Sequence, residues 1–338
     1  MYKFITIFLL VFISSTICVA KEAKNNSNYL NRDDVNTFIE HFAKKNNFAK
    51  SSIIALFENV QTQTDVLEAI QRPAEKKKNW TQYRKIFITD KRIQQGLEFW
   101  SENAQILAAA ERKYGVPPEI IVAIIGVETF YGRYKGKYPV LDSLVTLGFD
   151  YPPRQKFFRS ELEHFLLLTQ EEDLDPLNIK GSYAGAMGKS QFISSSYRNY
   201  AVDFDGDGVR DLWGSNEDVI GSVANYFKRH GWEQGAMVTV PAKISSDDRY
   251  KALLEKGSKP SITFSELNKY GVEFDYHVNG MEKIALLEFK KDDADEYWLG
   301  LKNFYVITRY NHSHMYAMAV YQLSQKIKQD IKDYVAKN

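Results

Sequence analysis

The chain has 338 residues, of which 44% are apolar, and its 44 Lys and Arg against 43 Asp and Glu give a formal net charge of +1. A chain without a strong net charge has no long-range attraction for a polyanion, so nucleic acid is not an expected partner. The length and the apolar fraction allow one large domain or two to three small ones.

Residues 1–20 have the features of a secretory signal peptide. An early lysine, an apolar run over residues 4–13 and a small residue at Ala20 come before a polar stretch, which predicts export and cleavage after Ala20. Cleavage there would remove Cys18, the only cysteine, and would exclude disulfides and a cysteine metal site. We expect a soluble periplasmic protein. The alternative is an outer-membrane lipoprotein modified at Cys18, which the bulky Ile17 disfavours.

A polar leader, predicted to be flexible, follows over residues 21–29, and the pattern then becomes helical. Val35, Phe38 and Phe42 recur at helical spacing after Asp33 and Asp34, either of which can cap the helix start. A second helical tract covers residues 94–114. These tracts predict an N-terminal helical domain over residues 30–100.

Residues 116–130 form the next predicted helix, which is apolar on every face and is therefore expected to be buried. Pro117 and Pro118 suit its first turn. Glu128 stands near its end, where desolvation would raise the pKa of the carboxyl and keep it protonated near neutral pH. A protonated glutamic acid is a suitable general acid for a glycosidic oxygen. The alternative is a helix-end carboxylate that is exposed or paired with Arg133.

Helices alternate with glycine-rich loops over residues 101–235, the predicted catalytic core, and its clearest helices cover residues 161–170 and 218–229. The loop over residues 179–192, IKGSYAGAMGKSQF, has glycines that allow close backbone approach to a ligand. Ser182 and Gln191 supply hydrogen-bonding groups there, and Met187 supplies an adaptable apolar contact. Taken alone, the segment also fits an ordinary glycine-rich turn.

The segment DFDGDGVRDL resembles the opening of an EF-hand calcium loop. Asp203, Asp205 and Asp207 stand at positions 1, 3 and 5, and Val209 can offer its carbonyl at position 7. Position 12 is Gly214 rather than the usual glutamate. A structural calcium ion is the predicted ligand, and a plain Asp/Gly turn or a sodium site is the alternative.

The pattern changes after residue 235. Runs over residues 237–244, 284–290 and 304–310 are rich in strand-forming residues, which predicts a small β-containing subdomain over residues 236–310. Residues 315–334 return to helical spacing. We expect the C-terminal part, residues 311–338, to pack back on the body as a helix. His312 and His314 have no obvious third metal ligand and are interpreted as structural.

Several motifs together resemble the lytic murein transglycosylase B family of the lysozyme-like superfamily. They are GVPPEIIVAIIGVETFYGR, IKGSYAGAMG, SQFISSSYRNYAVDFDGDG and IGSVANYFKRHGW, with RPAE from Arg72, YRKIFIT from Tyr83 and FYVITRYNHS from Phe304. The match runs in order over residues 30–322. The resemblance implies a mainly α fold of the α+β kind, with a lysozyme-like helical core, and it implies non-hydrolytic cleavage of peptidoglycan without an organic cofactor.

The resemblance also implies roles for single residues. Glu128 would first protonate the glycosidic oxygen between N-acetylmuramic acid and N-acetylglucosamine and then, as a base, assist closure of a 1,6-anhydro ring. Ser182, Met187 and Gln191 would line the cleft. Aromatic contacts to the glycan would come from Tyr83, Phe157, Tyr226, Tyr310 and Tyr316, although Phe157 stands where a family tyrosine is expected. Ser190 and Ser194 replace expected prolines.

The resemblance further places the last calcium carboxylate on a lengthened loop over residues 203–218. Asp218 or its neighbour Glu217 would supply this carboxylate, and Asp211 is a candidate for a ligand that acts through water.

Two alternative functions stay open at this point. A hydrolytic muramidase would need a second carboxylate in the cleft; Asp142 and Asp150 are nearest in sequence, but Asp142 has the position of a helix N-cap. A non-catalytic peptidoglycan-binding protein would keep the groove and the calcium loop. The expected partner is the peptidoglycan glycan strand. Proteins of cell-wall synthesis or remodelling are further candidates, and a membrane is one only if Cys18 is lipidated.

Overall fold

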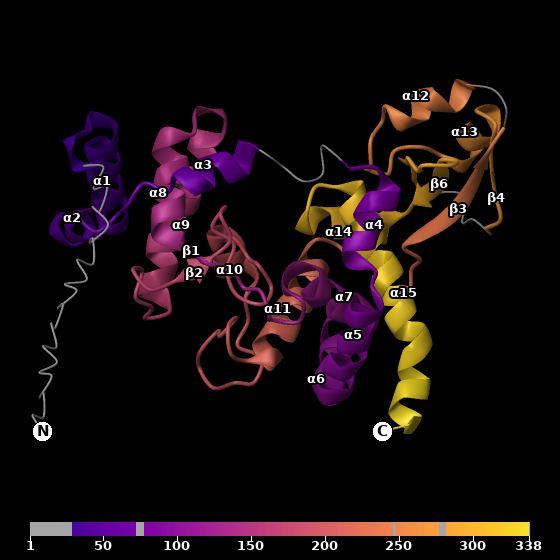
Figure 1. Cartoon of the computed structure of the whole chain (residues 1–338), viewed down its shortest axis with the longest axis horizontal. Coiled ribbons are helices and arrows are strands. Elements are labelled where there is room, and N and C mark those ends of the chain that lie inside the picture. Colours follow the sequence, from indigo (N-terminus) through magenta and orange to yellow (C-terminus); the bar gives the residue numbers. More distant parts are fainter. Residues whose placement is uncertain (1–28, 72–77, 246–247, 277–281, 338) are drawn as a thin grey trace, which may run out of the picture.

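The computed structural model describes residues 29–71, 78–245, 248–276 and 282–337. These residues form a mainly helical protein with a small antiparallel sheet at one end (Figure 1). The signal peptide, Cys18, residues 21–28 of the leader and the RPAE motif lie outside the described residues. No helix in the described ranges is long and apolar enough to cross a membrane.

The helices form two groups that are joined at the middle of the molecule. The first group contains α1 (Asp33–Asn46), α2 (Lys50–Phe57), α3 (Thr64–Gln71), α8 (Val140–Asp150) and α9 (Gln155–Glu171), which lie together on the left in Figure 1. Its aromatic centre includes Phe38, whose ring meets Phe149 edge-on at 5.7 Å. Early and late segments of the sequence therefore share one core.

The second group surrounds α7 (Pro118–Thr129). It contains α4 (Trp80–Phe87), α5 (Asp90–Glu102), α6 (Ala104–Tyr114), α11 (Asn216–Arg229), α14 (Lys302–Tyr310) and α15 (His314–Lys337). The apolar residues of α7 are buried on every side, as its sequence predicts. The predicted N-terminal helical domain over residues 30–100 contributes helices to both groups.

The helical tract expected over residues 94–114 is confirmed. It consists of two helices that meet at Asn103, whose side chain donates to the Phe99 carbonyl at 2.7 Å. The expected N-caps, in contrast, are wrong. Neither Asp33 nor Asp34 caps α1, because Asp34 instead pairs with two arginines, Arg32 at 3.1 Å and Arg159 at 2.6 Å.

Asp142 is also not an N-cap. The N-cap of α8 is Pro139, and Asp142 lies inside the first turn, where its carboxylate accepts a hydrogen bond from the Gln63 side chain at 2.9 Å. Burial raises the pKa of Asp142 above its usual value.

The β-containing part is a four-stranded antiparallel sheet in the order β4-β3-β6-β5. Its strands are β3 (Thr239–Ile244), β4 (Val272–Phe274), β5 (Ala285–Phe289) and β6 (Glu296–Gly300), with short helices α12 (Lys251–Leu254) and α13 (Phe264–Lys269) beside them. Side chains from both form a separate small core that includes Leu253, Leu267, Ile284 and Leu299.

The strand expected over residues 304–310 is wrong, because this segment is helix α14. Phe304 and Ile307 are three residues apart and fully buried, so a helix places both on the face that packs against the core. Tertiary packing here outweighs the strand preference of the β-branched residues. The C-terminal helix is confirmed as α15, and Lys328 on it binds the buried Glu119 of α7 at 2.7 Å.

Two short elements position the glycine-rich loop. Strands β1 (Tyr138–Pro139) and β2 (Lys180–Gly181) pair antiparallel, and α10 (Ser194–Tyr200) follows the loop. The hydroxyls of Ser190 and Ser194 are buried and have no hydrogen-bond partner among the described residues. Both occupy the positions where the family resemblance leads us to expect proline.

We predict that Ser194→Pro stabilises the protein. Ser194 is the first residue of α10, and Ile193 before it has φ −69° and ψ 163°, an extended conformation that is compatible with a following proline. Restricting the unfolded chain should raise the free energy of unfolding by about 0.4–1 kcal/mol, as measured by urea denaturation.

The adjacent Ser195→Pro is the matched control. It removes an N–H that donates to Glu161 Oε2 at 2.9 Å, so it should lower the free energy of unfolding. A loss of stability in Ser194→Pro as well would contradict the interpretation of this position.

Candidate active site

Glu128 lies in the last turn of α7, and the chain turns sharply directly after it. Phe130 and Tyr131 are both in the left-handed region, with φ of 53° and 59°, and Gly132 follows with φ 87°. Such a conformation is unfavourable for residues with a Cβ and persists only where surrounding contacts enforce it. Tyr131 folds back under the helix, where a Cβ at Gly126 would lie 2.5 Å from its hydroxyl oxygen.

The side chain of Arg92 on α5 holds the turn after Glu128 in place. Its guanidinium donates to the carbonyls of Gly126 at 3.1 Å and Phe87 at 2.9 Å, and it lies over the Phe130 ring at 4.5 Å. A buried cation at a helix C-terminus satisfies carbonyls that lack an intrahelical partner. The sequence does not indicate this role, because a single arginine in an amphipathic helix gives no signal for it.

The carboxyl of Glu128 meets a hydroxyl group from the far end of the chain. Tyr316, in the first turn of α15, donates to Glu128 Oε1 at 2.5 Å. Burial raises the pKa of Glu128 to about 7, and the hydrogen bond from Tyr316 acts in the opposite direction. Near neutral pH a large fraction of Glu128 is therefore protonated, as a proton donor requires.

Tyr226 and Tyr310 also lie near Glu128. Burial raises the pKa of each phenol, and the charge on Glu128 adds to the rise. Their rings are 4.8 Å apart, and their hydroxyls donate to the carbonyls of Arg309 at 2.5 Å and Ser190 at 2.6 Å. The predicted Tyr226, Tyr310 and Tyr316 are thus brought together around the carboxyl.

The two remaining aromatic candidates differ in their positions. Tyr83 on α4 is buried and lies near Tyr316. The pKa of Tyr316 is raised mainly by burial and by the charge on Glu128, and Tyr83 adds to this rise. Phe157 lies at the start of α9 beneath the Arg154 guanidinium at 4.2 Å. Within the described ranges its ring contacts are Arg154 and Phe158, so they do not link it to the tyrosines around Glu128.

The glycine-rich loop folds as a small hairpin. Met187 and Phe192 exchange backbone hydrogen bonds at 2.9 and 3.1 Å. Ser182 Oγ accepts from the Ala186 N–H at 3.0 Å, and Gln191 donates to the Gly188 carbonyl at 3.0 Å. The Met187 side chain is fully buried, so in this conformation it packs the loop and offers no surface to a sugar.

The predicted calcium loop brings three carboxylates together. Oxygens of Asp203, Asp205 and Asp218 lie within 4.8 Å of one another. Asp218 is buried at the start of α11 and accepts from the N–H groups of Phe204 and Asp211, each at 2.7 Å. This carboxylate therefore joins both ends of the loop.

The other loop candidates point elsewhere. Asp207 accepts from the Val209 N–H at 2.8 Å and is not among the three carboxylates brought together. Asp211 accepts from the N–H groups of Trp213 at 2.8 Å and Gly214 at 2.9 Å. Ser215, which the sequence analysis missed, donates to Asp205 at 3.0 Å, and its signal was its position as the N-cap of α11.

Comparison with known proteins is consistent with this arrangement. The family model of the transglycosylase SLT domain, SLT_2, matches residues 31–325. The membrane-bound lytic murein transglycosylase B of Escherichia coli strain K12 is 42% identical over 308 residues, which are 88% of this chain and 84% of that protein.

Two solved structures are similar over nearly the same length. Catenated SltB1 from Pseudomonas aeruginosa is 50% identical, with a TM-score of 0.85 and coverage of 89% of this chain and 98% of that chain. Escherichia coli Slt35 in complex with calcium is 42% identical, with a TM-score of 0.82 and coverage of 90% of this chain and 95% of that chain. The chain therefore belongs to the SLT-domain transglycosylase family, has its lysozyme-like fold and is a lytic murein transglycosylase.

Proposed function

We propose that Glu128 alone supplies both proton transfers in the cleavage of murein. The bond broken is the β-1,4 linkage between N-acetylmuramic acid and N-acetylglucosamine, and the product is a 1,6-anhydro ring on the muramyl residue. The observation that carries the proposal is the position of the Glu128 carboxyl. It lies at the end of an apolar helix, accepts from the Tyr316 hydroxyl at 2.5 Å and has a pKa that burial raises to about 7.

The surroundings of Glu128 favour a single carboxylate. Burial raises the pKa of Glu128, and the hydrogen bond from the Tyr316 hydroxyl lowers it. Among the described residues, no second carboxylate contributes to the shift. A hydrolase of the two-carboxylate kind places its second acid about 5 to 9.5 Å away. Attack by a hydroxyl of the same sugar needs no bound water and gains from proximity.

The reaction has two steps. Neutral Glu128 gives its proton to the glycosidic oxygen as the bond from that oxygen to C1 breaks, and the N-acetylglucosamine part leaves as an alcohol. The carboxylate then takes the proton of the C6 hydroxyl of the muramyl residue as O6 bonds to C1. Glu128 ends protonated and ready for another cycle.

Ser182 and Gln191 are our candidates for sugar contacts, with the tyrosines Tyr83, Tyr226, Tyr310 and Tyr316. Tyr316 has the additional role of holding the acid, since its hydroxyl binds Oε1. Phe157 stays a candidate for a more distant part of the groove. For Met187 a sugar contact would require the loop to open, because the side chain is fully buried.

We further propose that the loop over residues 203–218 binds a structural calcium ion through Asp203, Asp205 and Asp218. Oxygens within 4.8 Å of one another suit ligands of one cation at about 2.3–2.6 Å. The solved Slt35 complex with calcium supports this proposal by similarity. The Val209 carbonyl remains a candidate ligand, and Asp207 a weaker one.

We place the enzyme in the periplasm, where its murein substrate lies. The Escherichia coli relative is named membrane-bound. For this chain, cleavage after Ala20 and lipid attachment at Cys18 remain the two alternatives.

Glu128→Gln should reduce murein cleavage at least about 10³-fold, because the amide can neither donate nor accept the required proton. Mass spectrometry of the soluble products measures the effect. The parent should release muramyl products one water lighter than hydrolytic ones. Water-added products from the parent would favour the muramidase alternative, and undiminished turnover by Glu128→Gln would remove Glu128 from the mechanism.

Tyr316→Phe should move the alkaline limb of the pH profile of kcat/KM to higher pH. The acid acts in its neutral form, so the rate falls as the pH rises through the Glu128 pKa of about 7, and Tyr316 lowers that pKa. Removing the hydroxyl therefore raises the midpoint. Tyr310→Phe is the matched control, since its hydroxyl binds Ser190 instead. An unmoved or lower midpoint in Tyr316→Phe would contradict the assignment.

Calcium should raise the melting temperature of the parent and not that of a variant combining Asp203→Asn and Asp205→Asn. A ligand at 100 times its dissociation constant stabilises the folded state by about 2.7 kcal/mol, which thermal denaturation detects. Asp207→Asn should retain most of the rise, because its carboxylate lies outside the cluster. Failure of calcium to stabilise the parent would exclude the site.

A further inference from the structure

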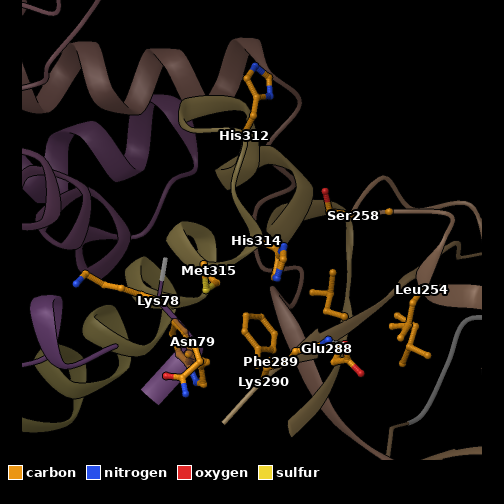
Figure 2. Close-up of a pocket in the computed structure, with 14 residues that line it drawn as sticks. Lys78, Asn79, Leu254, Ser258, Glu288, Phe289, Lys290, His312, His314 and Met315 are labelled. Carbon is orange, nitrogen blue, oxygen red and sulfur yellow. Dashed lines mark ion pairs between the residues drawn. The ribbon is translucent and has the colours of Figure 1, made fainter. Parts of the chain in front are cut away.

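A cavity of about 690 Å³ lies between the helical body and the four-stranded sheet. Its walls come from β5, from the start of α4, from the segment that contains Leu254 and Ser258, and from His312, His314 and Met315, as Figure 2 shows. Met315 lines the cavity, and the next residue, Tyr316, binds the carboxyl of Glu128. Consecutive residues of α15 therefore line the cavity and bind the Glu128 carboxyl.

The outer edge of β5 faces this cavity. In an antiparallel strand, the N–H and C=O of alternate residues point to the same side. Ile284 uses its outer groups to pair with Ile262 at 2.9 and 3.0 Å, and Lys290 accepts there from the Trp80 N–H at 2.7 Å. By alternation, the backbone groups of Glu288 face the same side, where β5 has no neighbouring strand.

No backbone partner for these outer groups of Glu288 is present in the parts of the chain that the structure describes. Glu288 is only half-buried and lines the cavity. An exposed strand edge with a free N–H and C=O is the feature that pairs with an extended peptide.

The side chains around this edge suit a peptide that carries carboxylates. Met315 supplies apolar surface, and His314 meets the ring of the fully buried Phe289 edge-on at 5.3 Å. Lys78 and Lys290 are exposed cations at the rim. Among the described residues, Glu288 is the one acidic residue that lines the cavity. Its carboxylate accepts from the Tyr297 hydroxyl at 3.2 Å and lies 3.7 Å from Lys290 Nζ.

We propose that this cavity binds the peptide that the murein strand carries on its muramyl residue. The peptide would extend along β5, pair with the backbone of Glu288 and place its carboxylates near Lys78 and Lys290. Murein supplies such a peptide next to the bond that is cleaved, so sugar and peptide would be bound together. The inference rests on the proposed function, because it gives the same site a second point of substrate contact.

Glu288→Pro tests the backbone contact directly. Proline removes the outward N–H and leaves the β5–β6 ladder intact, because an outward N–H on an edge strand is not part of the ladder. The probe is a tetrasaccharide of alternating N-acetylglucosamine and N-acetylmuramic acid, with or without its peptides. Calorimetry in the Glu128→Gln background, which stops cleavage, gives the two dissociation constants.

We expect the peptide-bearing tetrasaccharide to bind at least about tenfold more tightly, as one or two hydrogen bonds and a charge contact allow. Glu288→Pro should remove most of this difference. Glu288→Ala keeps the N–H and reports the side chain alone, so it should remove clearly less. Equal affinity for the two probes in the Glu128→Gln background, or equal losses in Glu288→Pro and Glu288→Ala, would overturn the proposal.

A second variant tests the proposal independently, in case Glu288→Pro does not fold. Lys78→Glu with Lys290→Glu reverses the rim charge on the surface and should also reduce the preference for the peptide-bearing probe. A preference that survives this change would count against the cavity. The products released by the parent decide the proposed function separately, since anhydro products can form whether or not the peptide binds here.

Discussion

The desolvation of one carboxyl group is the constraint on which the site depends. Glu128 stands at the end of a helix that is apolar on all faces, and burial raises its pKa to about 7. That burial is unfavourable for the charged form, so the surrounding structure must hold the carboxyl in place. Arg92 and Tyr131 hold the end of the helix, and Tyr316 binds the carboxyl itself.

Segments that are far apart in the sequence converge on this carboxyl. The tyrosines come from α11, α14 and α15, and the glycine-rich loop is held by the Tyr310 hydroxyl through the Ser190 carbonyl. The C-terminal helix α15 crosses α7 and α5 and is fixed to α7 by the pair of Lys328 and Glu119. Packing of α15 against α7 therefore places Tyr316 at the carboxyl of the proposed acid.

The sheet gives the molecule a second surface near the site. Its edge strand β5 borders a cavity that adjoins Met315, one residue from the tyrosine that holds the acid. An enzyme that acts on a polymer with peptide branches can use a cavity beside its active site to bind the peptide branch while the helical core binds the sugar. The four-stranded sheet and the helical core would then act on two chemical parts of one substrate.

The sequence by itself determined the family, the mainly α fold, the buried helix before Glu128 and the opening of the proposed calcium loop. These features are local, because they depend on residues near one another in the chain. Tertiary structure decided the rest. It made α14 a helix, because Phe304 and Ile307 are buried on one face. It gave Asp218 the place in the carboxylate cluster that the sequence left open between Asp218 and Glu217. It also brought Tyr316 to Glu128, a contact between residues 188 positions apart that no local pattern encodes.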